Sequence, residues 1–278
     1  MAGNERVVAV TGGARGIGLE IARAFVDDGA RVVVGDIDPQ VVRVARAHSG
    51  MIGYAGLDVS DPASFAAFLD FVADHAGPVD ILVNNAGVLS VGVIQDEPDD
   101  ATRRMVEVNL LGVINGTKAA LAWMLPRRAG QVINISSLSG EVAIPGGATY
   151  SATKHAVLGF SDAVRGELRG TGVEISCVLP TLVNTRMITG TGRTRGMRNA
   201  EPDEVAAAAV VLSHRPQPRV RVTRLAGAVS IASRFIPDAV WTPLARTAGL
   251  HDVFTTAVDH GARTDYEHTI QHLGQEKK

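Results

Sequence analysis

Tyr150 and Lys154 are the residues of this sequence best suited by spacing to acid–base chemistry. They stand four apart in a stretch with helical periodicity, so their side chains share one face of a helix and their polar ends can converge. A phenol with a pKa near 10 is a poor proton donor unless its anion is stabilised, and a neighbouring ammonium stabilises it. Ser137 adds a nearby hydroxyl. The same Tyr-x-x-x-Lys spacing also occurs where both residues are only structural.

A glycine-rich segment lies near the N-terminus, between a β-branched run and a helical pattern. It reads Thr11-Gly12-Gly13-Ala14-Arg15-Gly16-Ile17-Gly18. Glycines permit a tight turn here and let the backbone approach a diphosphate at the start of the helix, where free N–H groups and the helix dipole favour anions. Such turns also occur without a ligand, but the strand–loop–helix context favours a nucleotide.

Asp36 ends the next predicted strand, 18 residues after Gly18. A carboxylate at this place can accept hydrogen bonds from both adenosine ribose hydroxyls, and it would repel the 2′-phosphate of NADP. Arg15 has the opposite effect, because a guanidinium pairs with phosphate. We give Asp36 more weight, since close repulsion is harder to relieve than a long arginine is to move. The sequence predicts NAD as the cofactor, with NADP less favoured.

The scaffold that must position these residues alternates β-branched runs with alanine-rich helical stretches. Continuous apolar character, as in Val32–Val34, is typical of strands covered on both faces. The sequence therefore predicts an α/β fold, a Rossmann-type doubly wound parallel sheet in three α/β/α layers with a helical C-terminal extension. The predicted strands are 6–11, 31–36, 51–58, 81–84, 131–136 and 174–179, and the predicted helices are 19–28, 62–75, 99–125 and 148–169.

The chain beyond these elements continues with a predicted helix over 201–214 and a strand over 219–223, followed by mostly helical sequence with Pro237 and Pro243 as breaks. We predict a cofactor-binding and catalytic domain over residues 1–218 and an extension over 219–278 packed on it. Glycine and polar residues crowd 189–199, which predicts a mobile loop suited to a lid.

The composition limits the function classes. Apolar residues make up 46% and charged residues 20% of the chain, which is typical of a globular protein. A net charge of -2 gives no overall positive field, so we expect no nucleic acid partner. The single cysteine, Cys177, fits a reducing compartment, and Met1–Val10 lacks the pattern of a secretory signal. We expect a cytoplasmic protein without a metal site.

Taken together, the motifs resemble those of the short-chain dehydrogenase/reductase family over about residues 6–186. Four independent motifs in the family's order are far more specific than any one of them. The matching residues are Thr11-Gly12-x-x-x-Gly16-x-Gly18, Asp58-Val59, Asn84-Asn85-Ala86-Gly87, Asn109, Ser137 and Tyr150-Ser151-Ala152-Thr153-Lys154.

The resemblance implies an NAD(P)-dependent oxidoreductase that interconverts a secondary alcohol and a ketone. It assigns Tyr150 as acid/base, Ser137 as the hydroxyl that binds the substrate oxygen, and Lys154 as the residue that binds the nicotinamide ribose and tunes Tyr150. Asn109 would hold a water that links Lys154 to solvent. A different hypothesis, a catalytically idle nucleotide-sensing module, does not need all four residues intact.

The resemblance also implies the rest of the cofactor site. Gly12, Arg15, Gly16, Ile17 and Gly18 would hold the diphosphate, and Asp36 would bind the adenosine ribose. The remaining assignments are Asp58 and Val59 to adenine, Asn85, Ala86 and Gly87 to the floor beneath the adenosine ribose, and Pro180, Val183 and Thr185 to the nicotinamide carboxamide. Thr181 departs from the family's glycine, so a β-branched side chain narrows the cleft or changes the turn.

The C-terminal extension lacks the family's usual ending. Its apolar segment Leu225–Pro237 resembles members that act on lipophilic alcohols or ketones, including hydroxysteroid and retinoid dehydrogenases, so a lipophilic substrate is expected. We interpret this segment as packing on its own core or on a sister subunit in preference to weak contact with a membrane surface. The resemblance suggests a homodimer or homotetramer through the helices at 101–125 and 148–169.

Overall fold

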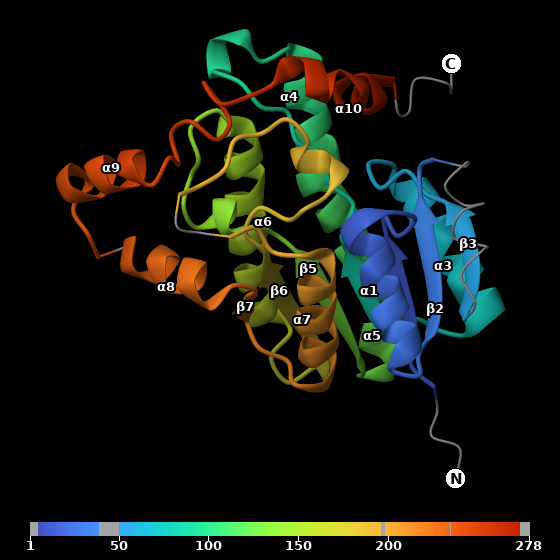
Figure 1. Ribbon diagram of the computed structural model, residues 1–278. Helices are drawn as coiled ribbons and strands as arrows, with labels where there is room; N and C mark the ends of the chain where they lie inside the picture. Colours follow the sequence, from blue (N-terminus) through green and yellow to red (C-terminus); the bar gives the residue numbers. More distant parts are fainter. Residues whose placement is uncertain (1–4, 39–49, 196–197, 234, 273–278) are drawn as a thin grey trace.

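The computed structural model describes residues 5–38, 50–195, 198–233 and 235–272 (Figure 1). At its centre is a seven-stranded sheet in the order β3-β2-β1-β4-β5-β6-β7, in which every recorded pairing is parallel. The strand order reverses between β1 and β4, which opens a crevice at the carboxyl ends of these strands. The strands are β1 (Val7–Thr11), β2 (Arg31–Asp36), β3 (Met51–Gly56), β4 (Ile81–Asn84), β5 (Gly130–Ile135), β6 (Val173–Leu179) and β7 (Arg219–Arg221).

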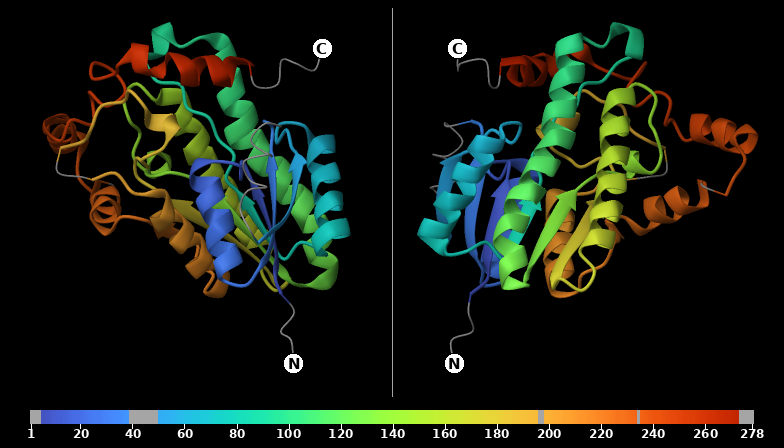
Figure 2. Two further views of the ribbon diagram at one scale, coloured as in Figure 1. Left: turned by 45° about the vertical axis from the view of Figure 1, so that its right-hand side comes forward. Right: turned by 180° about the vertical axis from the view of Figure 1, so that it is seen from behind.

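Helices cover both faces of the sheet, as the predicted α/β/α layering requires (Figures 1 and 2). On one face lie α1 (Gly16–Asp27) and α7 (Pro202–His214), whose buried side chains share a core with β1, β2 and β4. On the other face lie α3 (Pro62–Ala76), α5 (Gly112–Arg127) and α6 (Ala148–Glu167).

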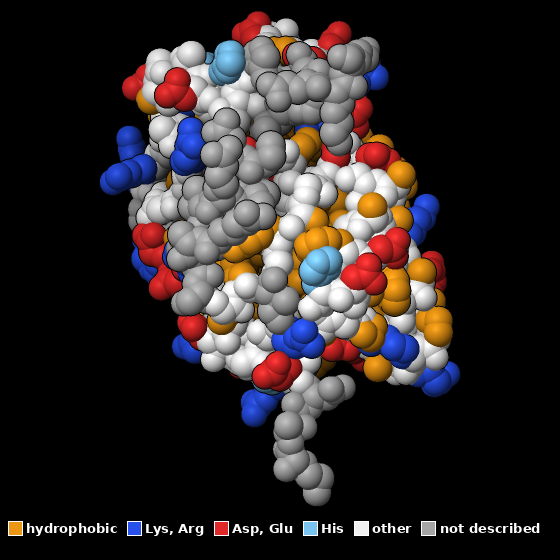
Figure 3. Space-filling model, turned by 90° about the vertical axis from the view of Figure 1, so that its right-hand side faces the viewer, with side chains coloured by type: hydrophobic (Ala, Val, Ile, Leu, Met, Phe, Trp, Pro, Cys, Tyr) orange, Lys and Arg blue, Asp and Glu red, His pale blue; other side chains and the backbone are white. Residues whose placement is uncertain are grey.

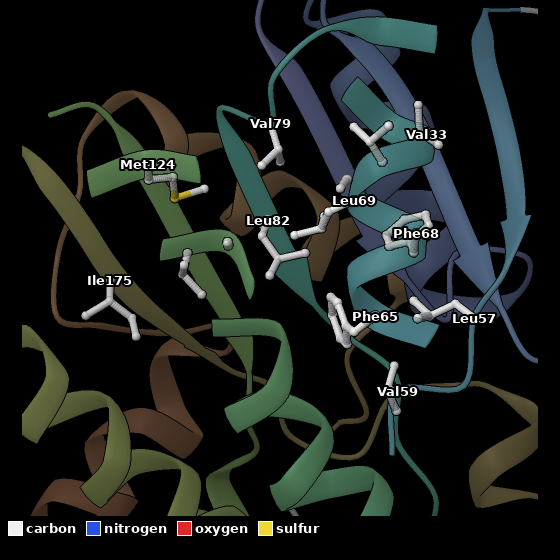
Figure 4. Close-up of a cluster of buried hydrophobic side chains, with 14 of the residues drawn as sticks. Val33, Leu57, Val59, Phe65, Phe68, Leu69, Val79, Leu82, Met124 and Ile175 are labelled. Atoms are coloured by element: carbon white, nitrogen blue, oxygen red, sulfur yellow. The ribbon is translucent and has the colours of Figure 1, made fainter. Parts of the chain in front are cut away.

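Successive strand residues point into opposite layers, so both must be apolar. Val33 faces the α3 layer, where Phe65, Phe68 and Leu69 pack against it and against Leu82 (Figure 4). Its neighbours Val32 and Val34 belong to the core beneath α1. This arrangement explains the continuous apolar runs of the strands.

The predicted helix over 99–125 is not a single α-helix. It consists of α4 (Asp99–Val106), a π-helical turn over Glu107–Leu111 and then α5. This stretch, Asp99–Arg127, is the one described helix long and apolar enough to cross a membrane by length and composition. Its Ala120 and Met124 instead pack in the core beside the sheet.

Several predicted boundaries differ from the structure by one to three residues. The first helix begins at Gly16 rather than Leu19, and β3 ends at Gly56 rather than Asp58. Pro237 precedes α9 (Asp238–Thr247) as a break, but the prediction that Pro243 also breaks the helix was wrong, because it lies inside α9. A proline removes one backbone donor, which a helix can survive with a kink.

The C-terminal extension consists of β7, α8 (Arg224–Ser233), α9 and α10 (His260–His272). In Figures 1 and 2, α8 extends outward from the β7 edge, α9 lies farther from the sheet than α8, and α10 lies beside α4. The loop predicted to be mobile is bonded to this extension, with Gly192 N–H donating to the Val253 carbonyl at 2.9 Å. Residues 196–197 of that loop lie outside the described residues. The division of the chain at residue 218 stays a prediction, and β7 pairs with β6 in the same sheet.

The face of the molecule over β3 and α3 carries charges of both signs (Figure 3). Lys and Arg side chains there alternate with Asp and Glu rather than forming a continuous basic surface.

Candidate active site

A cavity of about 360 Å³ opens at the carboxyl ends of the central strands. Its walls come from the loops that follow β1, β2, β4, β5 and β6 and from the C-terminal extension. Of the predicted site residues only Asn109 does not line it; those that do are Gly12, Arg15, Gly16, Ile17, Gly18, Asp36, Asp58, Val59, Asn85, Ala86, Gly87, Ser137, Tyr150, Lys154, Pro180, Val183 and Thr185.

The glycine-rich loop folds back onto the start of α1. Gly12 and Gly16 have positive φ values of 61° and 54°, which favour glycine. A Cβ on Gly18 would lie 2.2 Å from the Gly12 carbonyl oxygen, so this position has no room for a side chain. Arg15 precedes α1 without capping it by a side-chain hydrogen bond. The first N–H groups of α1 therefore fit a diphosphate.

Asn85 fixes this loop from the next strand. Its Nδ2 donates to the Thr11 carbonyl at 2.9 Å and to the Gly12 carbonyl at 3.2 Å. In return, the Thr11 hydroxyl accepts the backbone N–H of Asn85 at 3.0 Å and of Ala86 at 3.1 Å. The two motifs, more than 70 residues apart, form one hydrogen-bonded cradle.

Asp36 stands at the edge of this cradle with 7% of its surface exposed. Its carboxylate accepts hydrogen bonds from Asp38 N–H at 3.2 Å and Ala14 N–H at 3.4 Å. Burial raises the pKa of Asp36, and the hydrogen bonds and the Arg15 charge act against that rise. The predicted contact between this carboxylate and the ribose hydroxyls stays a prediction.

Tyr150 and Ser137 are brought together by the first turn of α6 and the end of β5. Ser137 caps the short 3₁₀ turn Leu138–Gly140, where its hydroxyl accepts the Ser139 N–H at 3.1 Å. Burial raises the pKa of Tyr150 to about 12, the hydrogen bond with Ser137 lowers it, and the charge of Tyr266 adds to the rise. The phenol is therefore neutral and able to donate a proton.

Lys154 lies one helical turn after Tyr150 and is 4% exposed. Its Nζ is 5.6 Å from the centre of the Tyr150 ring and donates to the Ile135 carbonyl at 3.0 Å. Burial lowers the pKa of Lys154 to about 8, so the ammonium form predominates below that pH. A Cβ on Gly87 would lie 3.8 Å from this Nζ, so glycine keeps the space beside it open.

Asn109 lies at the centre of the π-helical turn and is fully buried. Its Oδ1 accepts the Val88 N–H at 2.8 Å, and its Nδ2 donates to the Val88 carbonyl at 2.9 Å. The side chain thus fixes the backbone that follows Gly87. The predicted water between Asn109 and Lys154 stays a prediction.

Thr181 is accommodated without a special backbone conformation, because Arg128 is the one described non-glycine residue with positive φ. Its side chain lines the cavity beside Pro180. Of the two effects expected of this residue, the structure favours a narrower cleft over an altered turn.

Comparison with known proteins identifies the family. The family model of the short chain dehydrogenases matches residues 6–196. The chain belongs to the short-chain dehydrogenase/reductase family. It is an oxidoreductase that acts on CH–OH groups with NAD or NADP as acceptor, as predicted.

Several relatives cover most of this dehydrogenase. It is 32% identical to the D-beta-hydroxybutyrate dehydrogenase of Cupriavidus necator over 86% of this chain and 96% of that protein. It is 39% identical to the 3-alpha-(or 20-beta)-hydroxysteroid dehydrogenase of Mycobacterium tuberculosis over 75% of this chain and 82% of that protein.

Two solved structures share the fold of this dehydrogenase. A variant of the actinorhodin polyketide ketoreductase with NADPH superposes with a TM-score of 0.73 at 32% identity, covering 80% of this chain and 97% of that one. A short-chain dehydrogenase/reductase from Burkholderia phymatum with NAD gives a TM-score of 0.74 at 23% identity, covering 82% and 92%.

The structure adds cavity residues that sequence reasoning missed. Val253, Phe254, Leu89 and Val91 form a buried apolar cluster against which Tyr150 packs. Tyr266 of α10 lines the same cavity. The sequence around Val253, Phe254 and Tyr266 did not indicate that this part of the chain would pack over the cavity.

Proposed function

We propose that this dehydrogenase interconverts a lipophilic secondary alcohol and its ketone with NAD, using Tyr150 as the acid/base. The observation that carries the proposal is the meeting of Ser137, Tyr150 and Lys154 in the cavity that also contains the glycine cradle. A proton-transfer site beside a dinucleotide cradle is what an alcohol dehydrogenase needs.

The cradle would hold the cofactor diphosphate at the start of α1, with Asp36 at the adenosine ribose and Lys154 at the nicotinamide ribose. Asp58 and Val59 would contact adenine, Asn85, Ala86 and Gly87 would support the ribose, and Pro180, Val183 and Thr185 would hold the carboxamide. When bound, the nicotinamide takes up or supplies the hydride.

The chain's own residues handle the proton. In the oxidation direction Tyr150 first gives up its phenolic proton and becomes a phenolate. The carbinol C–H then leaves as hydride and the O–H proton passes to this phenolate, so that the products are the ketone, the reduced cofactor and one proton. Ser137 binds the substrate oxygen during the transfer. The ammonium of Lys154 stabilises the phenolate that Tyr150 must transiently become. Asn109 would hold a water that returns the proton to solvent.

Two features support the substrate and cofactor preferences. The wall around Tyr150 is apolar, built from Leu89, Val253 and Phe254 with Leu182 and Met187 beside them. A wall of this kind favours an aliphatic or polycyclic substrate, in line with the hydroxysteroid relative. The buried carboxylate of Asp36 favours NAD, although the neighbouring structures were solved with either cofactor.

The same family resemblance supports a homodimer or homotetramer, and the single cysteine, Cys177, supports a reducing compartment such as the cytoplasm. Val106, Leu111 and Leu125 are exposed along α4 and α5, where a second subunit would cover them. On α8 and α9, Leu225, Ile231 and Val240 are also exposed, so Leu225–Pro237 does not pack entirely on its own core. Light scattering with a Leu111→Glu variant tests the first surface, and a monomeric wild-type chain would exclude it.

Substitution of Tyr150 tests the activity. We expect Tyr150→Phe to keep the affinity for NADH in a fluorescence titration while lowering turnover of a ketone panel by about 10²-fold or more. Tyr54→Phe is the matched control, because Tyr54 lies on β3 outside the residues that line the cavity. Tight NADH binding without turnover, together with no effect of Tyr150→Phe, would instead establish a nucleotide sensor.

A further inference from the structure

The roof of the cavity contains a second phenol, Tyr266 of α10. Its hydroxyl oxygen accepts the backbone N–H of Leu89 at 3.1 Å. Leu89 belongs to the apolar cluster against which Tyr150 packs. Tyr150 and Tyr266 both line this cavity.

Arg263, one turn before Tyr266, fixes this roof. It is 0% exposed, and it donates to the carbonyls of Thr189 at 3.0 Å, Met187 at 3.1 Å and Leu89 at 3.3 Å. Its guanidinium carbon lies 5.2 Å from the centre of the Tyr266 ring. A buried cation with several carbonyl partners is costly to remove, so α10 is held firmly against the loops after β4 and β6.

The partner loop is shaped to receive this arginine. Gly190 has a φ of 73°, and a Cβ there would lie 2.8 Å from the Arg263 Cγ. The Gly190 carbonyl also accepts the Asp259 N–H at 2.8 Å. The position of Tyr266 over the cavity is therefore defined by packing and hydrogen bonds on both sides.

The hydroxyl of Tyr266 still has a hydrogen to donate. Its oxygen accepts one hydrogen bond, and among the described residues no acceptor for its own proton is recorded. Burial raises the pKa of Tyr266, so this proton is retained at neutral pH. A donor placed in a mostly apolar part of the wall is the kind of group that selects between substrates.

We propose that Tyr266 donates a hydrogen bond to a second oxygen of the substrate, remote from the reacting carbon, and that Arg263 is the residue that positions it. The substrate class is then a lipophilic ketone or alcohol with an additional carbonyl or carboxyl oxygen. This inference rests on the proposed dehydrogenase function and narrows it. The rival ligand is the cofactor diphosphate, since Tyr266 also lies within reach of the Arg15 charge.

Two ketones of equal chain length test the proposal, ethyl 3-oxohexanoate and 4-nonanone, of which only the first has a second carbonyl. We expect Tyr266→Phe to lower kcat/KM about 10-fold for the keto ester, mainly through KM, and less than 3-fold for 4-nonanone. Tyr54→Phe is the control. Equal losses on both ketones, no loss, or a weaker NADH affinity in a fluorescence titration would overturn the proposal.

The role of Arg263 is tested by the ratio of kcat/KM for the keto ester to kcat/KM for 4-nonanone. We expect Arg263→Met to reduce the preference for the keto ester as Tyr266→Phe does, and Arg263→Lys to restore part of it. Equal loss on both ketones with a lower melting temperature would show a structural role only. If Arg263→Met does not fold, Arg263→Lys alone decides, since an unchanged preference there contradicts positioning.

A binding measurement separates this inference from the proposed function. With NAD⁺ present, the keto ester should raise the melting temperature of the wild type more than that of Tyr266→Phe, whether or not turnover occurs. An equal rise in both proteins refutes the role of Tyr266. Absence of turnover in the wild type with no effect of Tyr150→Phe refutes the dehydrogenase function instead.

Discussion

The ammonium of Lys154 lies 5.6 Å from the centre of the Tyr150 ring, and in the first two turns of α6 Lys154 is buried and Tyr150 is half-buried. Burial moves their pKa values in opposite directions, that of Tyr150 up to about 12 and that of Lys154 down to about 8. Both shifts disfavour the charged form of each group. Burying these two ionisable groups therefore lowers the stability of the folded protein, and their shifted pKa values are of the kind found at functional sites.

The lowered pKa of Lys154 predicts that the stability difference between Lys154→Met and the wild type depends on pH. From pH 8 to 10.5 the unfolded wild-type chain binds a proton that the native Lys154 has lost, so wild-type stability rises with pH in that window. Methionine binds no proton. We expect the free energy of unfolding of the variant, relative to the wild type, to fall by up to about 3 kcal/mol across the window.

Urea denaturation at several pH values measures this difference. The variant should also lose turnover while NADH binding persists more weakly. A difference that stays flat between pH 7 and pH 10 would show that Lys154 keeps an ordinary pKa in the folded protein.

Asp36 should control the choice of cofactor. We expect Asp36→Ala to weaken NAD binding about 10-fold, because a charged hydrogen-bond acceptor for the ribose is removed, and to reduce discrimination against NADP. Fluorescence titration with NADH and NADPH measures both. Arg15→Ala is the complementary variant and should weaken NADPH more than NADH. An unchanged NADH to NADPH ratio in Asp36→Ala would remove the basis for assigning NAD.

Two glycines in helices should respond oppositely to alanine. Gly18→Ala places a Cβ 2.2 Å from the Gly12 carbonyl oxygen, so we expect a loss of about 2 kcal/mol in stability and a strong loss of NADH affinity. Gly166 in α6 has nothing within 4 Å of an added Cβ, and Gly166→Ala should stabilise by about 0.5 kcal/mol through reduced backbone entropy of the unfolded chain. Thermal unfolding compares them, and equal effects would contradict the cradle geometry.

The sequence predicted those parts of the site whose residues lie in one short motif and are positioned by local backbone structure alone. Gly12 to Gly18 and Tyr150 to Lys154 needed only local turns, and strands read from continuous apolar runs were placed within a few residues. The π-helical turn at Asn109 was not predictable, because the apolar pattern on either side continues through it. Arg263 was missed because its three carbonyl partners lie more than 70 residues away in sequence. Its burial is a property of the folded chain alone.

Glu141 illustrates the same limit and permits a further prediction. Its side chain is 0% exposed, although the sequence suggests an ordinary surface acid. Arg221 donates to both carboxylate oxygens, at 2.6 and 2.8 Å, Arg219 donates at 3.1 Å, and the Ser230 hydroxyl donates at 2.6 Å. These bonds tie β7 and α8 to the loop that begins at Ser137.

Glu141→Gln keeps the shape of the side chain but removes its charge, leaving Arg221 without its carboxylate. Because the two arginines are about one-fifth exposed, we expect a destabilisation of about 2 to 3 kcal/mol, less than for a fully buried pair. Ser230→Ala should cost only about 1 kcal/mol, since it removes one hydrogen bond. Hydrogen exchange should show faster opening of α8 in Glu141→Gln than in Ser230→Ala. Unchanged exchange in α8 with lower global stability would mean that the ion pairs support the sheet edge and not the helix that borders the cavity.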